Sequence, residues 1–293
     1  MAAQWSLIIF TLFVCLAAGT FGAQGYLALR GKGNALQVPA VIFAFVALII
    51  GGIASATHLQ TPTRFFNGFL GNMASGISLE LVAIAIAAIV MVVYFVLARK
   101  EAGVPKWMGA LAIIVAIALA VIAGLSYLMP ARPIWNNPAT VLFFVANAVL
   151  LGGIAAWLFA GIKADDEAAK TSIIITLVGA VLSIVVALWF WVAATGVTFD
   201  SIGYYFQTVA PTVAPVDADA VSGTLAANYS LLFWGVYVVI GAVVPAILAF
   251  LKIKKGAEGA TAFAGIALIC ALAGHIAYRY VFFLVGASSY LFF

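Results

Sequence analysis

The chain has 293 residues, of which 67% are hydrophobic and only 8% are charged. An ordinary soluble domain carries about 25% charged residues, so this composition excludes a soluble fold. The mean hydropathy is +1.24, and the apolar residues come in blocks of about 20, the length that crosses a bilayer. The net charge of +4 does not indicate nucleic-acid binding, because the basic residues stand in short connections between apolar blocks, where they set membrane topology.

The sequence predicts an all-α integral membrane protein with eight transmembrane helices in one bundle. Apolar spans without an alternating period must pair their backbone groups within a helix, because lipid offers no partner. In chain order the expected helices cover Ser6–Leu29, Val38–Thr57, Leu79–Ala98, Trp107–Met129, Thr140–Ile162, Ser172–Thr195, Leu231–Leu251 and Phe263–Leu284. The first is expected to be retained rather than cleaved, because no basic residue precedes it. Residues 1–293 are treated as a single eight-helix transmembrane domain.

Basic residues are distributed unevenly between alternate connections. One set of connections contains nearly all of them, and the other, which includes both termini, contains only Arg64 and Arg132. The first set holds Arg30, Lys32, Arg99, Lys100, Lys106, Lys163, Lys170, Lys252, Lys254 and Lys255. Because Lys and Arg accumulate on the cytoplasmic side, we expect both termini to face outward from the cytoplasmic (inner) membrane.

The outward connections are longer and richer in side-chain chemistry than the inward ones, so we expect function on the outer face. They are Thr57–Ser78, Pro130–Ala139 and Gly196–Ser230. Residues 196–230 contain Asp200, Asp217 and Asp219 but no Lys or Arg. We interpret this segment as a docking surface for a soluble partner, with a plain solvated cover over the helix ends as the alternative.

Ionisable residues at membrane depth are costly and are the first candidates for function. His58, Glu80, His275 and Arg279 all fall in the outward halves of their spans. A His that titrates near neutral pH and a carboxylate at an apolar boundary are able to accept protons. Arg64 and Asn67 add hydrogen-bond donors beside Phe65, Phe66 and Phe69, and this set suits the oxidation of a quinol, which loses two protons with its two electrons.

Each of these residues also has a plain structural interpretation. His58 could simply cap a helix end, and Glu80 could simply be an acidic residue that a helix N-terminus favours. Ser75 and Ser78 could form only an N-cap. Trp107 and Trp135 are expected to be interfacial belt residues, and Cys15 and Cys270 to be small buried hydrophobic residues.

Four motifs carry a resemblance to a known family. They are His58-Leu-x-x-Pro62-x-Arg64-x-x-Asn67, Ser75-x-x-Ser78-x-Glu80, Tyr127 with Pro133-x-Trp135-Asn136, and Arg279-x-x-Phe282-Phe283. The chain resembles the membrane-anchor subunit family of dimethyl sulfoxide reductase, within the wider group of molybdopterin oxidoreductase membrane anchors. Chain length, eight spans and outward termini also resemble that family.

The resemblance implies a subunit of anaerobic respiration that anchors an iron–sulfur electron-transfer subunit and a molybdopterin catalytic subunit at the outer face. It would oxidise menaquinol, pass the electrons to the iron–sulfur subunit and release protons outward, while terminal-substrate catalysis lies in the partner. No haem or metal is expected in this chain. By position, His58 and Glu80 match the catalytic residues, and Arg64, Asn67, Tyr127 and Trp135 would shape the quinol pocket. To these we add His275 and Arg279.

One departure from the family is His275, which stands where a glutamate is common four residues before the helix-eight arginine. Two histidines on different helices are the minimum for a b-type haem, so a haem-bearing quinol oxidoreductase subunit is one alternative. A secondary transporter is another, although the inverted repeats and broken helices that it predicts are not evident. A purely structural anchor without a quinol site is the third.

Overall fold

The computed structural model describes residues 4–58, 67, 75–197, 225–254 and 258–286. These residues form helices and connections but no strand. The helices are α1 (Trp5–Leu29), α2 (Asn34–His58), α4 (Gly76–Ala98), α5 (Lys106–Leu125), α6 (Pro138–Ile162), α7 (Asp166–Thr195), η2 (Leu231–Val243), α9 (Val244–Lys252) and α10 (Ala260–Val285). Leu225–Lys252 is one continuous span that contains both η2 and α9. The described helices therefore supply the 8 long apolar spans that the sequence predicts.

The helix ends differ from prediction where polar residues join a helix. Helix α7 begins at Asp166 rather than Ser172, because the Asp165 carboxylate caps it and accepts a 2.9 Å hydrogen bond from the Ala168 amide. Asp166 and Glu167 in its first turn favour the same start, since acidic residues are stabilised at a helix N-terminus. Helix α5 ends at Leu125 instead of Met129.

The seventh span contains an element that the apolar pattern does not predict. Its central part, η2, is a π-helix, and Pro245 stands directly after it in α9. Proline has no N–H and its ring clashes with the carbonyl four residues earlier, so it disturbs the regular hydrogen-bond ladder at Gly241. We attribute the wider turns that precede Pro245 to this disturbance, and π-helical turns of this kind occur frequently near functional sites.

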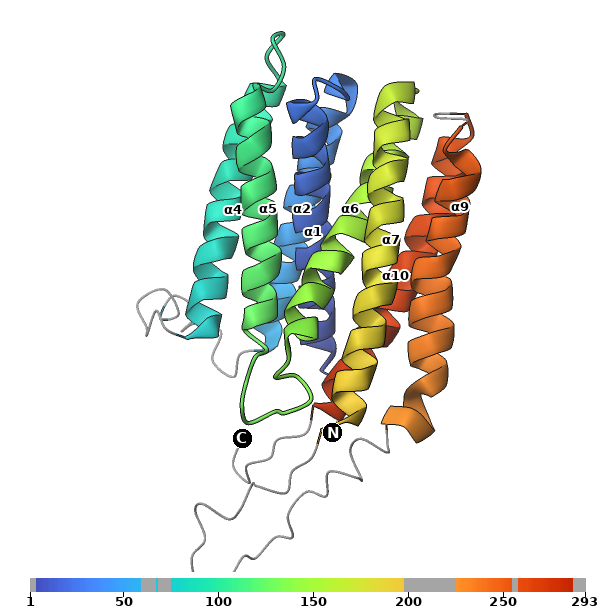
Figure 1. Cartoon of the computed structure of the whole chain (residues 1–293). Helices are drawn as coiled ribbons and strands as arrows, with labels where there is room; N and C mark the ends of the chain where they lie inside the picture. The colour runs from blue at the N-terminus through green and yellow to red at the C-terminus, as the bar shows by residue number, and fades with distance from the viewer. Residues whose placement is uncertain (1–3, 59–66, 68–74, 198–224, 255–257, 287–293) are drawn as a thin grey trace, which may run out of the picture.

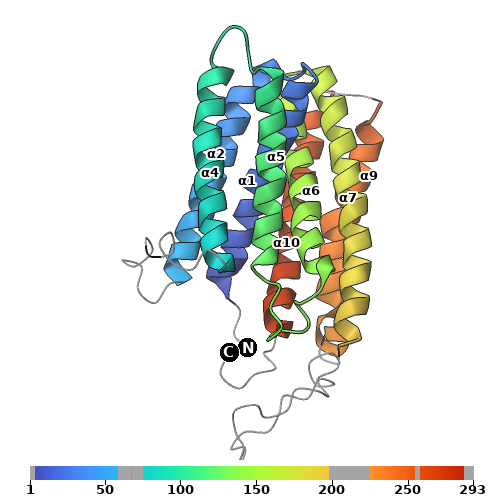
Figure 2. The same ribbon diagram turned by 60° about the vertical axis from the view of Figure 1, so that its left-hand side comes forward.

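Helices α1 and α6 form the centre of the bundle, whereas α4 lies at its edge, as Figures 1 and 2 show. The central pair crosses closely at Gly19 and Gly152. A methyl carbon at Gly19 would lie 2.6 Å from the Ala148 carbonyl carbon and 2.9 Å from the Gly152 nitrogen. Small residues let helix backbones approach in this way, which is how helices associate in lipid.

The outer surface of the bundle is apolar along its length. Large side chains such as Ile53, Ile89 and Ile269 are more than 60% exposed, as expected where lipid replaces water. Cys15 is fully buried, which confirms its prediction, but Cys270 is only partly buried, so the expectation that both are buried is wrong for Cys270. Ile266 and Ile269 beside it are 51% and 69% exposed, so this part of α10 faces outward and its neighbours cover the Cys270 side chain only in part.

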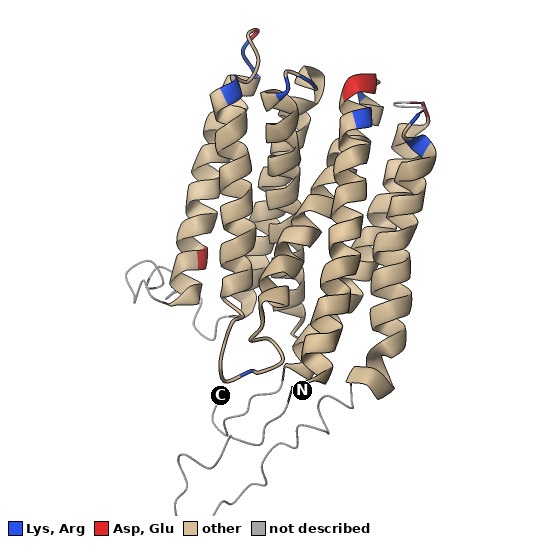
Figure 3. Ribbon diagram, viewed as in Figure 1, with Lys and Arg blue, Asp and Glu red and all other residues tan. Residues whose placement is uncertain are grey.

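Most of the described charges gather at one end of the bundle, which Figure 3 shows at the top and which we call the basic end. It comprises the connections 30–33, 99–105 and 163–165 with residues 253–254 and 258–259, in agreement with the uneven distribution of Lys and Arg in the sequence. Helix α1 begins and α10 ends at the opposite end, which we call the site end (Figure 1).

Candidate functional site

The described candidate residues lie in the half of the bundle toward the site end. His58 is the last residue of α2, Glu80 is in the second turn of α4, and Tyr127 and Trp135 belong to the connection between α5 and α6. Arg279 is six residues before the end of α10, about 9 Å along the helix axis. Segments far apart in the sequence therefore meet at this end of the bundle.

Glu80 is a buried carboxyl group near the start of α4. Its side chain is only 8% exposed, and its Oε1 atom has no hydrogen-bond partner within the described residues. Ser75 occupies the N-cap position of α4, but its side chain makes no capping hydrogen bond, and Glu80 lies beyond the first turn, where the helix dipole acts most strongly. A buried acceptor without a partner is costly, so the structural role as a simple helix-start residue does not account for Glu80.

The connection between α5 and α6 folds back over the bundle and buries two aromatic rings. The Trp135 indole N–H donates a 2.8 Å hydrogen bond to the Phe282 carbonyl of α10, and the Trp135 and Phe282 rings stack with centroids 4.7 Å apart. Tyr127 packs edge-on against Trp135, with centroids 5.5 Å apart. Trp135 is 3% exposed, so the prediction that it is a belt residue is wrong, whereas Trp107 is 61% exposed at the basic end.

Arg132 fixes this connection to the end of α10. Its guanidinium donates to the Gly286 carbonyl and lies 4.6 Å from the Trp135 ring centroid, a cation–π distance. Burial lowers the pKa of Arg132 below its ordinary value. Thr140, in the first turn of α6, donates a 2.8 Å hydrogen bond to the Trp135 carbonyl and so holds the connection from the other side.

Arg279 is a buried cation that joins α10 to α1. Its Nε donates to the Thr11 hydroxyl at 2.9 Å and its Nη2 to the Thr11 carbonyl at 3.2 Å. A third bond, from Nη1, reaches the His275 carbonyl at 3.2 Å. No Asp or Glu of the described residues lies within ion-pair distance of Arg279, so its positive charge is satisfied by neutral oxygens and by the ring of Phe143, 5.3 Å away.

His275 lies one helical turn deeper than Arg279 and is fully buried. Its ring packs against Phe143 and Tyr237, with centroids 6.4 and 5.5 Å away, and both ring nitrogens lack hydrogen-bond partners in the described part of the chain. Tyr237 belongs to the π-helix η2, so the unusual turn of the seventh span contributes to the surroundings of His275.

Glu80 and Arg279 both act electrostatically on Tyr127. Burial raises the pKa of the Tyr127 hydroxyl well above its ordinary value, the charge of Glu80 acts in the same direction, and the charge of Arg279 opposes it. The phenol of the connection therefore feels the charge of both the buried carboxyl of α4 and the guanidinium of α10, because charges interact strongly in a low-dielectric setting. We call Glu80, Tyr127, Trp135 and Arg279 the site cluster.

The remaining candidates stand apart from the site cluster. His58 and Asn67 are exposed, and the His58 side chain makes no ion pair with the described residues. Arg64 and most of the outward segment 196–230 lie outside the described residues. In the part of the chain that the structure covers, no three His, Cys, Asp or Glu side chains gather as metal ligands would.

Comparison with known proteins identifies the family. The family model described as DMSO reductase anchor subunit (DmsC) matches residues 1–285. The chain belongs to this family. One relative, the anaerobic dimethyl sulfoxide reductase chain YnfH of Escherichia coli (strain K12), is 30% identical over 160 residues, which make up 52% of this chain and 56% of YnfH. The match thus spans little more than half the length of that relative.

Two residues at the site of this anchor-family chain were not expected from the sequence. Thr11 supplies two of the three acceptors of Arg279, and Phe143 packs against both Arg279 and His275. Thr11 and Phe143 look like ordinary members of apolar spans, and Thr11 is 268 positions from Arg279. The sequence indicates only that an arginine within an apolar span requires hydrogen-bond acceptors from a neighbouring helix, and it does not indicate which residues supply them.

Proposed function

We propose that this chain is the membrane anchor and quinol-oxidising subunit of a molybdopterin/iron–sulfur oxidoreductase complex. Membership of the anchor-subunit family and eight apolar spans support the anchoring role. The observation that carries the redox role is Glu80, a buried carboxyl with an oxygen that has no partner among the described residues, and whose charge acts on the Tyr127 hydroxyl. A structural helix needs no such group, whereas a site that takes a proton from a bound quinol does.

Each residue of the site cluster has a separate proposed role in quinol oxidation. Glu80 accepts a proton from a quinol hydroxyl, and the positive charge of Arg279 stabilises the negative charge that then develops on the quinol oxygen. Three of the five guanidinium N–H groups of Arg279 donate to Thr11 and His275, and these bonds hold its positive charge in place. Trp135 and Tyr127 offer the flat apolar walls that a quinol ring requires.

His58 is the second proposed proton acceptor. It stands exposed at the end of α2, so it is placed to pass protons from the site end to water. If the basic end faces the cytoplasm, as the distribution of Lys and Arg favours, these protons leave on the outer side of the cytoplasmic membrane. The electrons pass to an iron–sulfur subunit bound at the site end, which in turn supplies a molybdopterin catalytic subunit.

Menaquinol is the substrate that the family resemblance favours. The haem alternative requires His58 and His275 to face one cofactor, but His58 is exposed at a helix end while His275 is enclosed by Phe143 and Tyr237. This difference in surroundings favours the haem-free proposal.

The substitution Glu80→Gln tests the proposal, because it keeps the shape of the side chain and removes its ability to accept a proton. In the assembled complex we expect quinol-driven reduction of the terminal acceptor to fall by about 100-fold or more. Reduction driven by a reduced viologen dye, which delivers electrons directly to the partner subunits, should be unchanged. Glu101→Gln, an exposed glutamate in a basic-end connection, is the matched control and should retain full quinol-driven activity. Full activity of the Glu80→Gln complex would refute the proposal.

A further inference from the structure

A groove separate from the site cluster opens on the side of the bundle between α5 and α7. It has a volume of about 500 Å³, and its walls are Ala, Gly, Ile and Val side chains of α1, α5, α6 and α7. Ile117 and Ile174, each 53% exposed, stand beside its opening, so the groove faces the lipid rather than the bundle interior. In Figure 1 the upper half of α1 is seen through the space between α5 and α7.

The residues of α1 that face the groove change in character along the helix. Gly19, Gly22 and Ala23 form a floor of small residues, and Tyr26 and Arg30 follow at the basic end. Spacings of three and four residues place all five on one face of α1. The groove lining on α1 extends from Ala18 to Arg30, which is about 18 Å at 1.5 Å per residue. One leaflet of the hydrocarbon core is about 15 Å thick, so an acyl chain fits this length.

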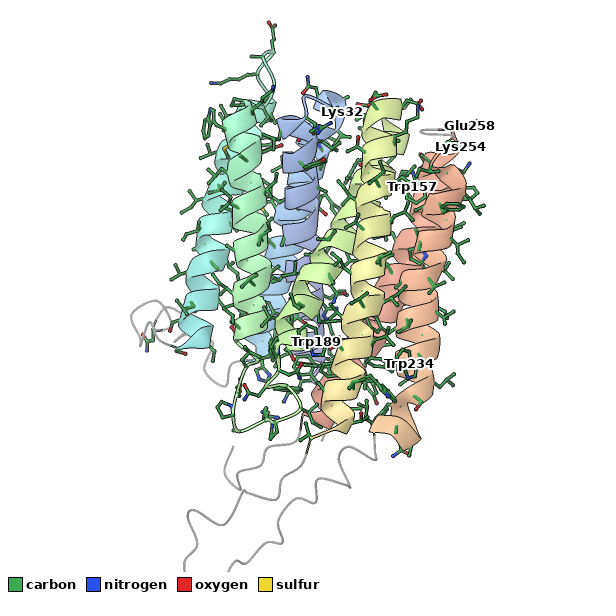
Figure 4. The ribbon with its side chains drawn as sticks, viewed as in Figure 1. Lys32, Trp157, Trp189, Trp234, Lys254 and Glu258 are labelled. Carbon is green, nitrogen blue, oxygen red and sulfur yellow. The ribbon has the colours of Figure 1, made fainter. Side chains whose placement is uncertain are left out.

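Positive charge stands at the basic end of the groove. Arg30 is exposed and has no ion pair within the described residues. Lys32 also lines the groove, and its ammonium lies 2.8 Å from the Glu167 carboxylate and 3.4 Å from the Thr171 hydroxyl. Figure 4 shows Lys32 at this end of the bundle. Because Glu167 balances Lys32, Arg30 is the unmatched cation, and the Tyr26 hydroxyl one turn away is a further donor.

We infer that this groove binds an anionic phospholipid, with one acyl chain on the small-residue floor of α1 and the phosphate beside Arg30, Tyr26 and Lys32. Charge complementarity favours a lipid over a quinol tail, since a quinol carries no negative headgroup to meet Arg30. A second groove, of about 230 Å³ between α2 and α4, has only apolar and aromatic lining side chains and serves as an internal comparison.

Native mass spectrometry of the purified full-length chain tests the inference. Dioleoyl phosphatidylglycerol and dioleoyl phosphatidylcholine are added at equal concentration, and the apparent association constant of each is measured. We expect the wild type to prefer phosphatidylglycerol and Arg30→Gln to weaken its binding about fivefold, with phosphatidylcholine unaffected. The matched control Lys100→Gln removes an exposed charge of the same end, outside the groove lining, and should leave both constants unchanged.

Filling the groove supplies a second test. Ala23→Leu should weaken the binding of both lipids, whereas Val92→Leu, in the comparison groove, should not. Equal binding of the two lipids by the wild type would overturn the inference, and so would an unchanged association constant of Arg30→Gln for phosphatidylglycerol. These two results decide the inference even if Ala23→Leu does not fold. Loss of quinol oxidation in Ala23→Leu with unaltered phosphatidylglycerol binding would also overturn it, by assigning the groove to the quinol tail.

Discussion

Because α1 and α6 cross closely at Gly19, we expect a single added methyl group there to lower the stability of the bundle. Gly19→Ala would place a carbon 2.6 Å from the Ala148 carbonyl carbon, nearer than the 3.0 Å below which real contacts of this kind are essentially never found. The added carbon would also overlap the Ala148 carbonyl oxygen, and because non-bonded heavy atoms prefer about 3.5–4.0 Å, the two helices must separate by more than about 1 Å. Overpacking of this kind costs about 1–3 kcal/mol, and the better helix propensity of alanine offsets about 1 kcal/mol of that.

Gly265→Ala in α10 is the matched control, because a methyl group there meets nothing within 4 Å. With no clash, only the propensity gain of about 1 kcal/mol remains, so this variant should be slightly stabilised. We expect Gly19→Ala to have a lower midpoint of thermal unfolding than the wild type in detergent, and Gly265→Ala an equal or higher one. Equal midpoints for the two variants would contradict the close crossing of α1 and α6.

Two further predictions concern the site cluster. Trp135→Phe keeps the stack on Phe282 but removes the indole N–H that donates to the Phe282 carbonyl. Because that carbonyl then loses a partner, we expect the free energy of unfolding to fall by about 1–2 kcal/mol, measured by thermal unfolding. A midpoint unchanged from the wild type would contradict that hydrogen bond. Arg279→Lys keeps the charge but cannot reproduce the paired contact with Thr11, so quinol-driven activity should fall while dye-driven activity of the complex is retained. Full quinol-driven activity in Arg279→Lys would show that the position of the charge does not matter.

The sequence predicts the eight spans well because lipid leaves an apolar chain few alternatives. A segment of about 20 apolar residues must form a helix in the bilayer, whichever neighbours it packs against. The ends are harder, because a capping residue such as Asp165 extends a helix into polar sequence. The π-helix η2 depends on how the surrounding helices accommodate Pro245, and the hydrophobic pattern of the sequence does not indicate this.

The candidate site was predictable in its residues but not in its contacts. Glu80 and Arg279 were identifiable because ionisable residues are rare in apolar spans. The assignment of Trp135 to the interfacial belt failed because an aromatic residue beside a helix end has the same local sequence signal whether it faces lipid or folds back over the bundle. The pairing of Arg279 with Thr11 joins the first and last helices, and only the packed bundle brings them together.

Photoaffinity labelling with an azido-menaquinone analogue tests the proposed quinol site most directly. The complex is labelled in native membranes, and the modified peptides of this chain are located by mass spectrometry. We expect labels at the start of α4 near Glu80 and in the connection that contains Tyr127 and Trp135, and we expect excess unlabelled quinol to protect both. Protected labels confined to the groove between α5 and α7, near Arg30, would contradict a quinol site at the site end.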